Sequence, residues 1–241
     1  EAVSDMTMAI MLSELRNVAR SYRDVTTDTS SWRKEWPSTP YLPHMADCKV
    51  GVFGFGMIGR LVAKKCAGFG SEILVYDPYV PDEVVKGFGY TPVSKEDLFK
   101  QADIVTIHAR FVEATRGIVG RKEIESMKPT AYFINTARSG LLDNDALLEA
   151  LQNHRIGGAA LDVFPEEPLP ADSPWRRLDN CTVTAHMAGG VMSARDYAAK
   201  LVVSAVLATI KGEKVPQLVT KDTVDTEAYK AWAEEAKKEF F

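Results

Sequence analysis

Short apolar runs alternate with helical patterns from residue 49 to residue 185, and this alternation limits the possible folds more than any other feature of the sequence. A strand that is apolar throughout is typical of a sheet covered on both faces, and strands separated by helices pair in parallel. We therefore expect an α/β fold with a doubly wound parallel sheet over 49–190. Strands are predicted in KVGVFGF (49–55), EILVY (72–76), DIVTIH (103–108), AYFIN (131–135), GGAALDV (157–163) and CTVTA (181–185), and helices over 57–67, 94–101, 121–127 and 143–153.

A glycine pattern follows the first predicted strand. GFGMIG (54–59) has the spacing G-x-G-x-x-G at the start of a helix, where free backbone amides can approach a pyrophosphate. Asp77 ends the next strand at about the spacing of the carboxylate that accepts from ribose hydroxyls and repels the extra phosphate of NADP. These features predict a Rossmann domain with NAD as cofactor, against the plainer alternative of a glycine turn needed only for packing. The residues predicted to bind it are Gly54, Gly56, Met57, Ile58, Gly59 and Asp77.

Charged residues and a histidine stand at the ends of later strands, where ligands bind in such sheets. INTARSG carries Arg138, LDVFPEEPLP carries Asp162 followed by Glu166 and Glu167, and TAHMAGG carries His186. A carboxylate beside an imidazole stabilises the protonated ring and fixes its orientation, as a general acid–base requires. Spacing alone leaves the choice between the two glutamates open. An ion pair, an acidic surface loop and an ordinary histidine are the plainer interpretations.

The sequence resembles the NAD-dependent D-2-hydroxyacid dehydrogenases over nearly its whole length. The resemblance rests on VGVFGFGMIGR with VYDP, on INTARSG, on GGAALDVFPEEPLP and on VTAHMAGG, in the family's order. It implies hydride transfer between NAD(H) and a D-2-hydroxy or 2-oxo acid, with Arg138 binding the substrate, Glu167 as the catalytic glutamate and His186 as the acid–base. Further cofactor contacts are expected at Ala109, Thr136, Ala137, Arg138, Asp162, His186 and Gly189.

Several positions depart from the family's pattern. Ala109 and Arg110 stand where many relatives have a small or apolar residue and proline, Ser139 replaces a frequent glycine, and Ala185 replaces a common proline. These changes bear on the subfamily rather than on the chemistry. SPWRRL (173–178) resembles the formate dehydrogenase branch, which typically has glutamine in place of the catalytic glutamate. An enzyme of that branch and an NAD(H)-sensing interaction module, similar to the C-terminal-binding-protein corepressors, remain as alternatives.

The resemblance also implies a domain organisation in which the NAD domain is inserted into a second, smaller substrate domain. Remnants of that domain are expected as an interdomain helix over 1–24, an arm over 25–48 that carries Trp32 and Trp36, and an exit helix with a return segment over 191–241. Most of the first half of the substrate domain is expected to be missing. We therefore expect residues 1–241 alone to bind NADH but to turn over slowly.

The composition of the chain indicates which kinds of binding partner are to be expected. The 33 acidic and 29 basic residues are mixed along the chain, and no basic stripe indicates a nucleic-acid partner. LVVSAVLATI (201–210) is shorter than the ~20 apolar residues of a membrane span. Cys48, Cys66 and Cys181 are too far apart in sequence to suggest a disulfide framework or a metal site. We expect a cytoplasmic homodimer that acts on a small 2-hydroxy or 2-oxo acid.

Overall fold

The computed structural model describes residues 1–27, 44–211 and 215, and the chain divides into two compact units. The larger unit holds nearly all of residues 1–188, and the smaller unit begins at Gly189. Residues 28–43 of the expected arm, with Trp32 and Trp36, lie outside the described residues, as does the expected return segment apart from Val215. Within the described ranges, no helix combines the length and the apolar character needed to cross a membrane.

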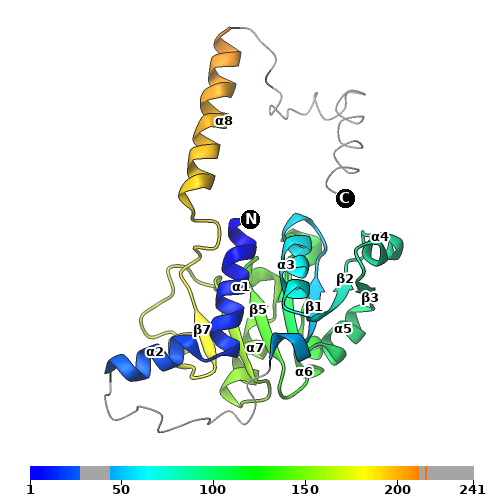
Figure 1. Ribbon diagram of the computed structural model, residues 1–241. Helices are drawn as coiled ribbons and strands as arrows, with labels where there is room; N and C mark the ends of the chain where they lie inside the picture. Colours follow the sequence, from blue (N-terminus) through cyan, green and yellow to red (C-terminus); the bar gives the residue numbers. More distant parts are fainter. Residues whose placement is uncertain (28–43, 212–214, 216–241) are drawn as a thin grey trace. The chain divides into compact units, whose positions relative to one another are not determined.

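A parallel sheet of seven strands forms the centre of the larger unit, in the order β3-β2-β1-β4-β5-β6-β7 (Figure 1). The chain moves outward from β1 to β3 and then returns to β4 beside β1, so the strand order reverses between β1 and β4. This is the predicted doubly wound fold, and such reversals are where ligands bind. The strands are β1 (Lys49–Phe53), β2 (Glu72–Tyr76), β3 (Thr91–Pro92), β4 (Ile104–Ile107), β5 (Tyr132–Asn135), β6 (Gly158–Leu161) and β7 (Cys181–Val183).

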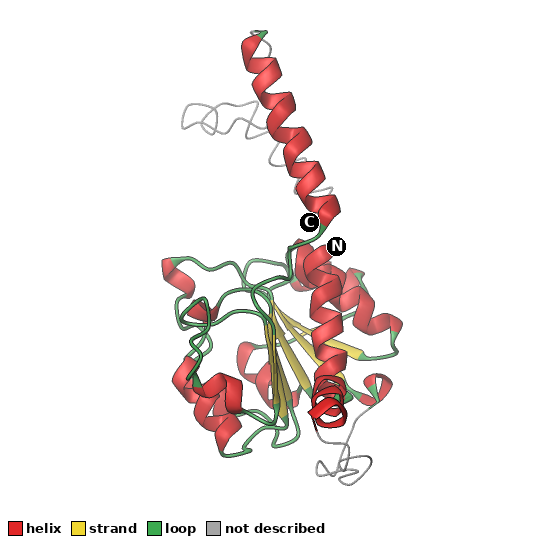
Figure 2. Cartoon of the chain, turned by 90° about the vertical axis from the view of Figure 1, so that its left-hand side faces the viewer, coloured by secondary structure: helices red, strands yellow, loops and turns green. Residues whose placement is uncertain are grey.

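Helices cover both faces of this sheet, as Figure 2 shows. One cluster of buried apolar side chains packs α5, α6 and α7 against one face, and a second cluster packs α1, α3 and α4 against the other. The strands contribute to both clusters, which is why their sequences are apolar throughout. The helices of the larger unit are α1 (Ala2–Leu15), α2 (Val18–Thr27), α3 (Met57–Gly68), α4 (Asp82–Gly87), α5 (Lys95–Gln101), α6 (Arg121–Glu125) and α7 (Asn144–Gln152), and the smaller unit contains α8 (Met192–Ile210).

The amino-terminal helix differs from the single element expected over 1–24. Asn17 has a backbone φ of 53°, in the left-handed region, and separates α1 from α2. Asparagine adopts this conformation more readily than other non-glycine residues. The chain direction therefore changes after Leu15, and α2 buries none of its residues.

Candidate active site

The three glycines after β1 have different structural roles. Gly54 has a φ of 95°, and a Cβ atom there would lie 2.7 Å from the backbone nitrogen of Ala109, in the segment after β4. A Cβ atom on Gly59 would overlap the carbonyl oxygen of Gly54, so α3 packs directly on the loop. At Gly56, by contrast, a Cβ atom would meet nothing within 4 Å. Packing requires the first and third glycines, and the second leaves room for a ligand to approach the backbone.

The first turn of α3 offers donors beside this space. Gly56 is the N-cap, and no side chain forms a capping hydrogen bond there. Met57 and Ile58 are 63% and 37% exposed, so their surroundings are open. Free amides and the helix dipole at such an end favour an anion. These residues fit the pyrophosphate of a dinucleotide, which the backbone amides of Met57 and Ile58 would hold.

Asp77 is fixed next to the glycine loop. Its Oδ2 accepts from the amide of Phe55 at 2.8 Å, and its Oδ1 accepts from the amide of Tyr79 at 2.9 Å. Each carboxylate oxygen keeps a further lone pair, so the side chain can still accept from ribose hydroxyls. The amide bond to Phe55 joins the end of β2 to the loop after β1, and this holds the charge where a nucleotide ribose is expected.

His186 and Glu167 form the central contact of the site. His186 Nδ1 lies 2.6 Å from Glu167 Oε2, and Glu167 Oε1 accepts from the amide of Phe164 at 2.8 Å. Burial opposes the charge of Glu167, but these two hydrogen bonds and the positive charges of His186 and Arg138 outweigh it and lower its pKa. Glu166 is exposed and has no such contact. The structure therefore pairs His186 with the second of the two glutamates, and among the described residues Nε2 has no hydrogen-bond partner.

Asp162 sets the turn that presents His186. The histidine has a φ of 50°, a conformation that costs a non-glycine residue on the order of 1 kcal/mol or more. The backbone oxygen of Asp162 accepts from the amide of His186 at 2.8 Å. Its buried carboxylate accepts from the amides of Met187 and Ala188 at 3.0 and 2.9 Å and from the Thr184 hydroxyl at 2.6 Å. Sequence reasoning placed Asp162 near the cofactor and missed this positioning role.

Arg138 stands on a turn that a buried residue holds. The side-chain amide of Asn135 donates to the carbonyl oxygen of Arg138 at 3.1 Å and accepts from the amide of Ala137 at 2.9 Å. Ser139 Oγ donates to the carbonyl oxygen of Phe164 at 2.8 Å, which joins this turn to the loop after β6. The guanidinium of Arg138 is exposed and, within the described ranges, forms no ion pair with a carboxylate. Asn135 was also missed, although an asparagine where a strand ends is a recognised turn signal.

Two other polar side chains at this edge of the sheet, those of Thr136 and His108, form hydrogen bonds within the protein. Thr136 is buried, and its hydroxyl lies 2.8 Å from that of Thr7 on α1. His108 Nε2 lies 2.9 Å from the Thr106 hydroxyl, and burial lowers its pKa to about 3, so the ring is neutral at physiological pH. Gly189 is the first residue of the smaller unit, with open space where a side chain would start. A cofactor contact at Thr136 would therefore use its backbone.

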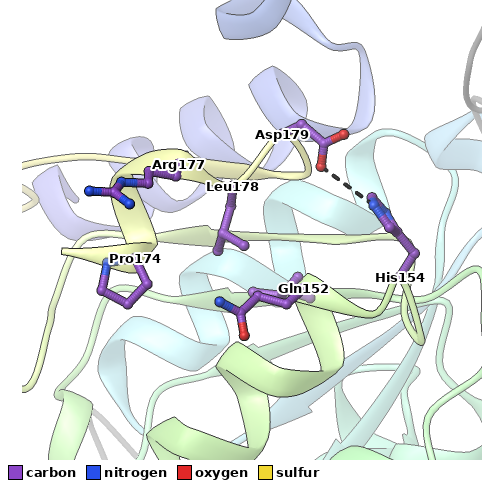
Figure 3. Close-up of a pocket in the computed structure, with 7 residues that line it drawn as sticks. Gln152, His154, Pro174, Arg177, Leu178 and Asp179 are labelled. Atoms are coloured by element: carbon purple, nitrogen blue, oxygen red, sulfur yellow. Dashed lines mark ion pairs between the residues drawn. The ribbon is translucent and has the colours of Figure 1, made fainter. Parts of the chain in front are cut away.

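The pocket in Figure 3 lies apart from this site. It has a volume of about 340 Å³ and lies between the end of α7 and the segment before β7, near the amino ends of β6 and β7. The ion pair between His154 and Asp179, 3.7 Å long, borders it. None of the predicted site residues contributes to it. Its lining residues are Leu151, Gln152, His154, Pro174, Arg177, Leu178 and Asp179.

Known proteins resemble this chain in sequence and in structure. The D-3-phosphoglycerate dehydrogenase of Methanocaldococcus jannaschii is 36% identical over 228 residues, which cover 94% of this chain and 42% of that protein. The glyoxylate reductase of Thermofilum pendens is 34% identical over 230 residues, which cover 93% of this chain and 66% of that protein. The D-lactate dehydrogenase of Lactobacillus jensenii, solved with NAD⁺, has a TM-score of 0.80 at 25% identity, covering 91% of this chain and 68% of that one. The chain thus spans less than two thirds of the length of the first two relatives.

A family model covers most of the larger unit. Residues 8–188 match the D-isomer specific 2-hydroxyacid dehydrogenase, NAD binding domain. The matched range contains the glycine loop, Asp77, Arg138, Glu167 and His186. It also contains all seven strands of the sheet. The chain belongs to the D-isomer specific 2-hydroxyacid dehydrogenase family and carries its NAD-binding domain.

Proposed function

We propose that this chain supplies the NAD-binding domain and the acid–base pair of an enzyme that interconverts a D-2-hydroxy acid and a 2-oxo acid. The observation that carries this proposal is the 2.6 Å contact between His186 Nδ1 and Glu167 Oε2. It lies at the carboxyl edge of a sheet whose glycine loop fits a dinucleotide. Relatives named glyoxylate reductase and D-3-phosphoglycerate dehydrogenase support the class of reaction.

Arg138, His186 and Glu167 each have a separate role in the reaction. NADH, when bound, supplies the hydride. Arg138 binds the carboxylate of the 2-oxo acid through its planar guanidinium and so orients the reacting carbon. Protonated His186 donates from Nε2 to the carbonyl oxygen as that carbon is reduced, and in the reverse direction it accepts the hydroxyl proton. Glu167 stabilises the imidazolium and keeps the ring in place, with its own charge secured by the Phe164 amide.

The cofactor side of the proposal assigns two roles. The amides of Met57 and Ile58 bind the pyrophosphate at the start of α3. Asp77 accepts from the adenosine ribose hydroxyls and disfavours the additional phosphate of NADP. The hydrogen bonds to Phe55 and Tyr79 support this assignment because they keep the carboxylate in one orientation.

The proposal also includes an oligomeric state and a cellular compartment for the protein. A cytoplasmic homodimer is the expected form, and three cysteines that are all free thiols are consistent with the cytoplasm. The location is also consistent with acidic and basic residues that are mixed along the chain. Sedimentation of the full-length protein with NADH tests the oligomeric state, and a purely monomeric species would contradict the dimer.

The proposed activity is tested by NADH oxidation with glyoxylate, pyruvate and bulkier 2-oxo acids, using the full-length protein. His186→Asn removes the acid–base and suits the left-handed backbone at that position. We expect turnover to fall about 10²–10⁴-fold while NADH affinity is kept. The matched control is His154→Asn, at a histidine with a similar φ of 49° that is remote from the site. Parental turnover in His186→Asn would contradict the assignment.

A further inference from the structure

Arg110 is a cation that the proposed function leaves unexplained. It lies three residues beyond the end of β4, and it is exposed. In the described part of the chain, its guanidinium has no hydrogen bond and no carboxylate within ion-pairing distance. The segment is therefore able to present a positive charge to a ligand.

The sheet places the segment that carries Arg110 beside the segment that carries Arg138. Strands β4 and β5 are parallel neighbours in which Ile107 is paired with Asn135. Each arginine stands three residues beyond its member of this pair. Neighbouring strands are ~4.8 Å apart, so the two segments leave the same edge of the sheet side by side.

The two segments stay in contact beyond the strands. A Cβ atom on Gly140 would lie 2.7 Å from the ring of Phe111, so these two residues touch. The amide of Gly117 donates to the carbonyl oxygen of Gly140 at 2.9 Å. The two segments that carry Arg110 and Arg138 are therefore held together before these residues by the β4–β5 pairing, and after them by the contacts of Gly140 with Phe111 and Gly117.

The backbone that carries Arg110 is also held in place. The hydroxyl of Thr115 donates to the carbonyl oxygen of Arg110 at 2.8 Å and accepts from the amide of Val112 at 2.9 Å. The acidic residue of this loop, Glu113, is paired with Arg116 at 2.9 Å. Its charge is therefore already balanced within the loop, and the positive charge of Arg110 is not.

We propose that Arg110 determines specificity by selecting 2-oxo acids that carry a second anionic group, either a carboxylate or a phosphate. This inference rests on the proposed function, in which Arg138 binds the carboxylate next to the reacting carbon. A distal anion forms charge-assisted hydrogen bonds with Arg110, whereas a substrate with one charge leaves that guanidinium in water. The phosphates of the cofactor are a second source of the same anionic chemistry, and the experiment separates the two.

The test is steady-state kinetics on the full-length protein with Arg110→Gln. Glyoxylate and pyruvate represent substrates with one anionic group, and oxaloacetate and phosphohydroxypyruvate represent those with two. We expect kcat/KM to fall about 10- to 100-fold for the second class, mainly through KM, which is the scale of a hydrogen bond to a charged group. For the first class it should stay within about twofold. Arg110→Lys should recover part of the loss because it restores the charge.

A matched control is Arg121→Gln, which removes one exposed arginine that is already paired with Glu149 at 2.7 Å. It should leave both substrate classes unchanged. Equal losses for both classes, or no loss in Arg110→Gln, would overturn the inference and leave the proposed function intact. A loss of NADH affinity in Arg110→Gln would assign the residue to the cofactor phosphates instead. A parent protein that reduces none of the four acids would contradict the proposed function and this inference together.

Discussion

Glu167 holds a carboxylate oxygen 2.6 Å from Nδ1 of His186. Its pKa is lowered despite burial, because His186 and the Phe164 amide bind its oxygens, so the carboxylate is charged at neutral pH. A negative charge at this distance attracts the positive charge of the imidazolium that donates the proton in reduction. Glu167→Gln keeps the shape and removes the charge. We expect the alkaline limb of kcat/KM for 2-oxo acid reduction to move to lower pH.

The control for this residue is its neighbour. Glu166→Gln removes a carboxylate of the same loop that does not contact His186, and its pH profile should match that of the parent. An unchanged profile in Glu167→Gln would remove this residue from the acid–base role. The comparison needs only the initial rate of NADH oxidation across a range of pH.

Spacing could bring the two candidate glutamates near His186 but could not choose between them. The choice depends on how the loop after β6 folds, and there the amide of Phe164 binds Glu167 itself. The same holds for the turn of His186, since its donors reach Asp162 across neighbouring strands. The sequence therefore predicts which residue types stand at the strand ends. It does not predict the hydrogen bonds that orient their side chains.

At the scale of elements, Glu14 links α1 to the edge of the sheet. It is 4% exposed, its Oε2 accepts from the Thr182 hydroxyl at 2.6 Å, and Arg20 lies 3.9 Å from Oε1. Burial raises the pKa of Glu14, and Thr182 and Arg20 offset this only in part, while Asp179 adds to the increase. The folded chain therefore binds this proton more tightly than the unfolded chain does. Its contribution to stability is greatest below the unfolded pKa and is lost as the pH rises through the folded pKa.

Glu14→Gln should remove this dependence on pH. An amide carries no charge to bury and can still accept from Thr182, so the free energy of unfolding should rise by on the order of 1 kcal/mol at neutral pH. The gain over the parent should shrink in acid, where Glu14 is protonated in both states. Urea unfolding at two pH values measures this, and Glu149→Gln is an exposed control. A gain that is independent of pH would show that it does not come from the charge of Glu14, and a loss at neutral pH would show that this charge is stabilising.

The elements themselves were predictable where their sequence pattern is long enough. Six strands were expected from unbroken apolar runs, and the structure has all six. The exception is β3, which consists of Thr91 and Pro92 paired with Leu74 and Val75. Two residues give no periodicity, and the six residues of α4 are fewer than two helical turns. The break at Asn17 was missed for a related reason, because the apolar pattern continues across it.

At the scale of the whole molecule, the larger unit contains every predicted cofactor-binding residue except Gly189. The glycine loop, Asp77 and both buried clusters lie within residues 1–188. Arg138, Glu167 and His186 lie in the same unit. We therefore expect residues 1–241 to bind NADH, even though they span 42% and 66% of the two relatives with which they were compared.

Cofactor selectivity should appear directly in the thermal stability of residues 1–241. A ligand at about 100 times its Kd adds about 2.7 kcal/mol to the free energy of unfolding, which for a chain of this size raises Tm by roughly 5–10 °C. NADH should produce such a shift and NADPH a much smaller one, because Asp77 faces the additional phosphate. Asp77→Asn keeps an acceptor for the Phe55 amide and removes the negative charge that repels the additional phosphate, so the two shifts should converge. Asp82→Asn, a nearby exposed change of the same charge, should preserve the difference. A parent chain that NADPH stabilises as strongly as NADH would show that Asp77 does not face the ribose.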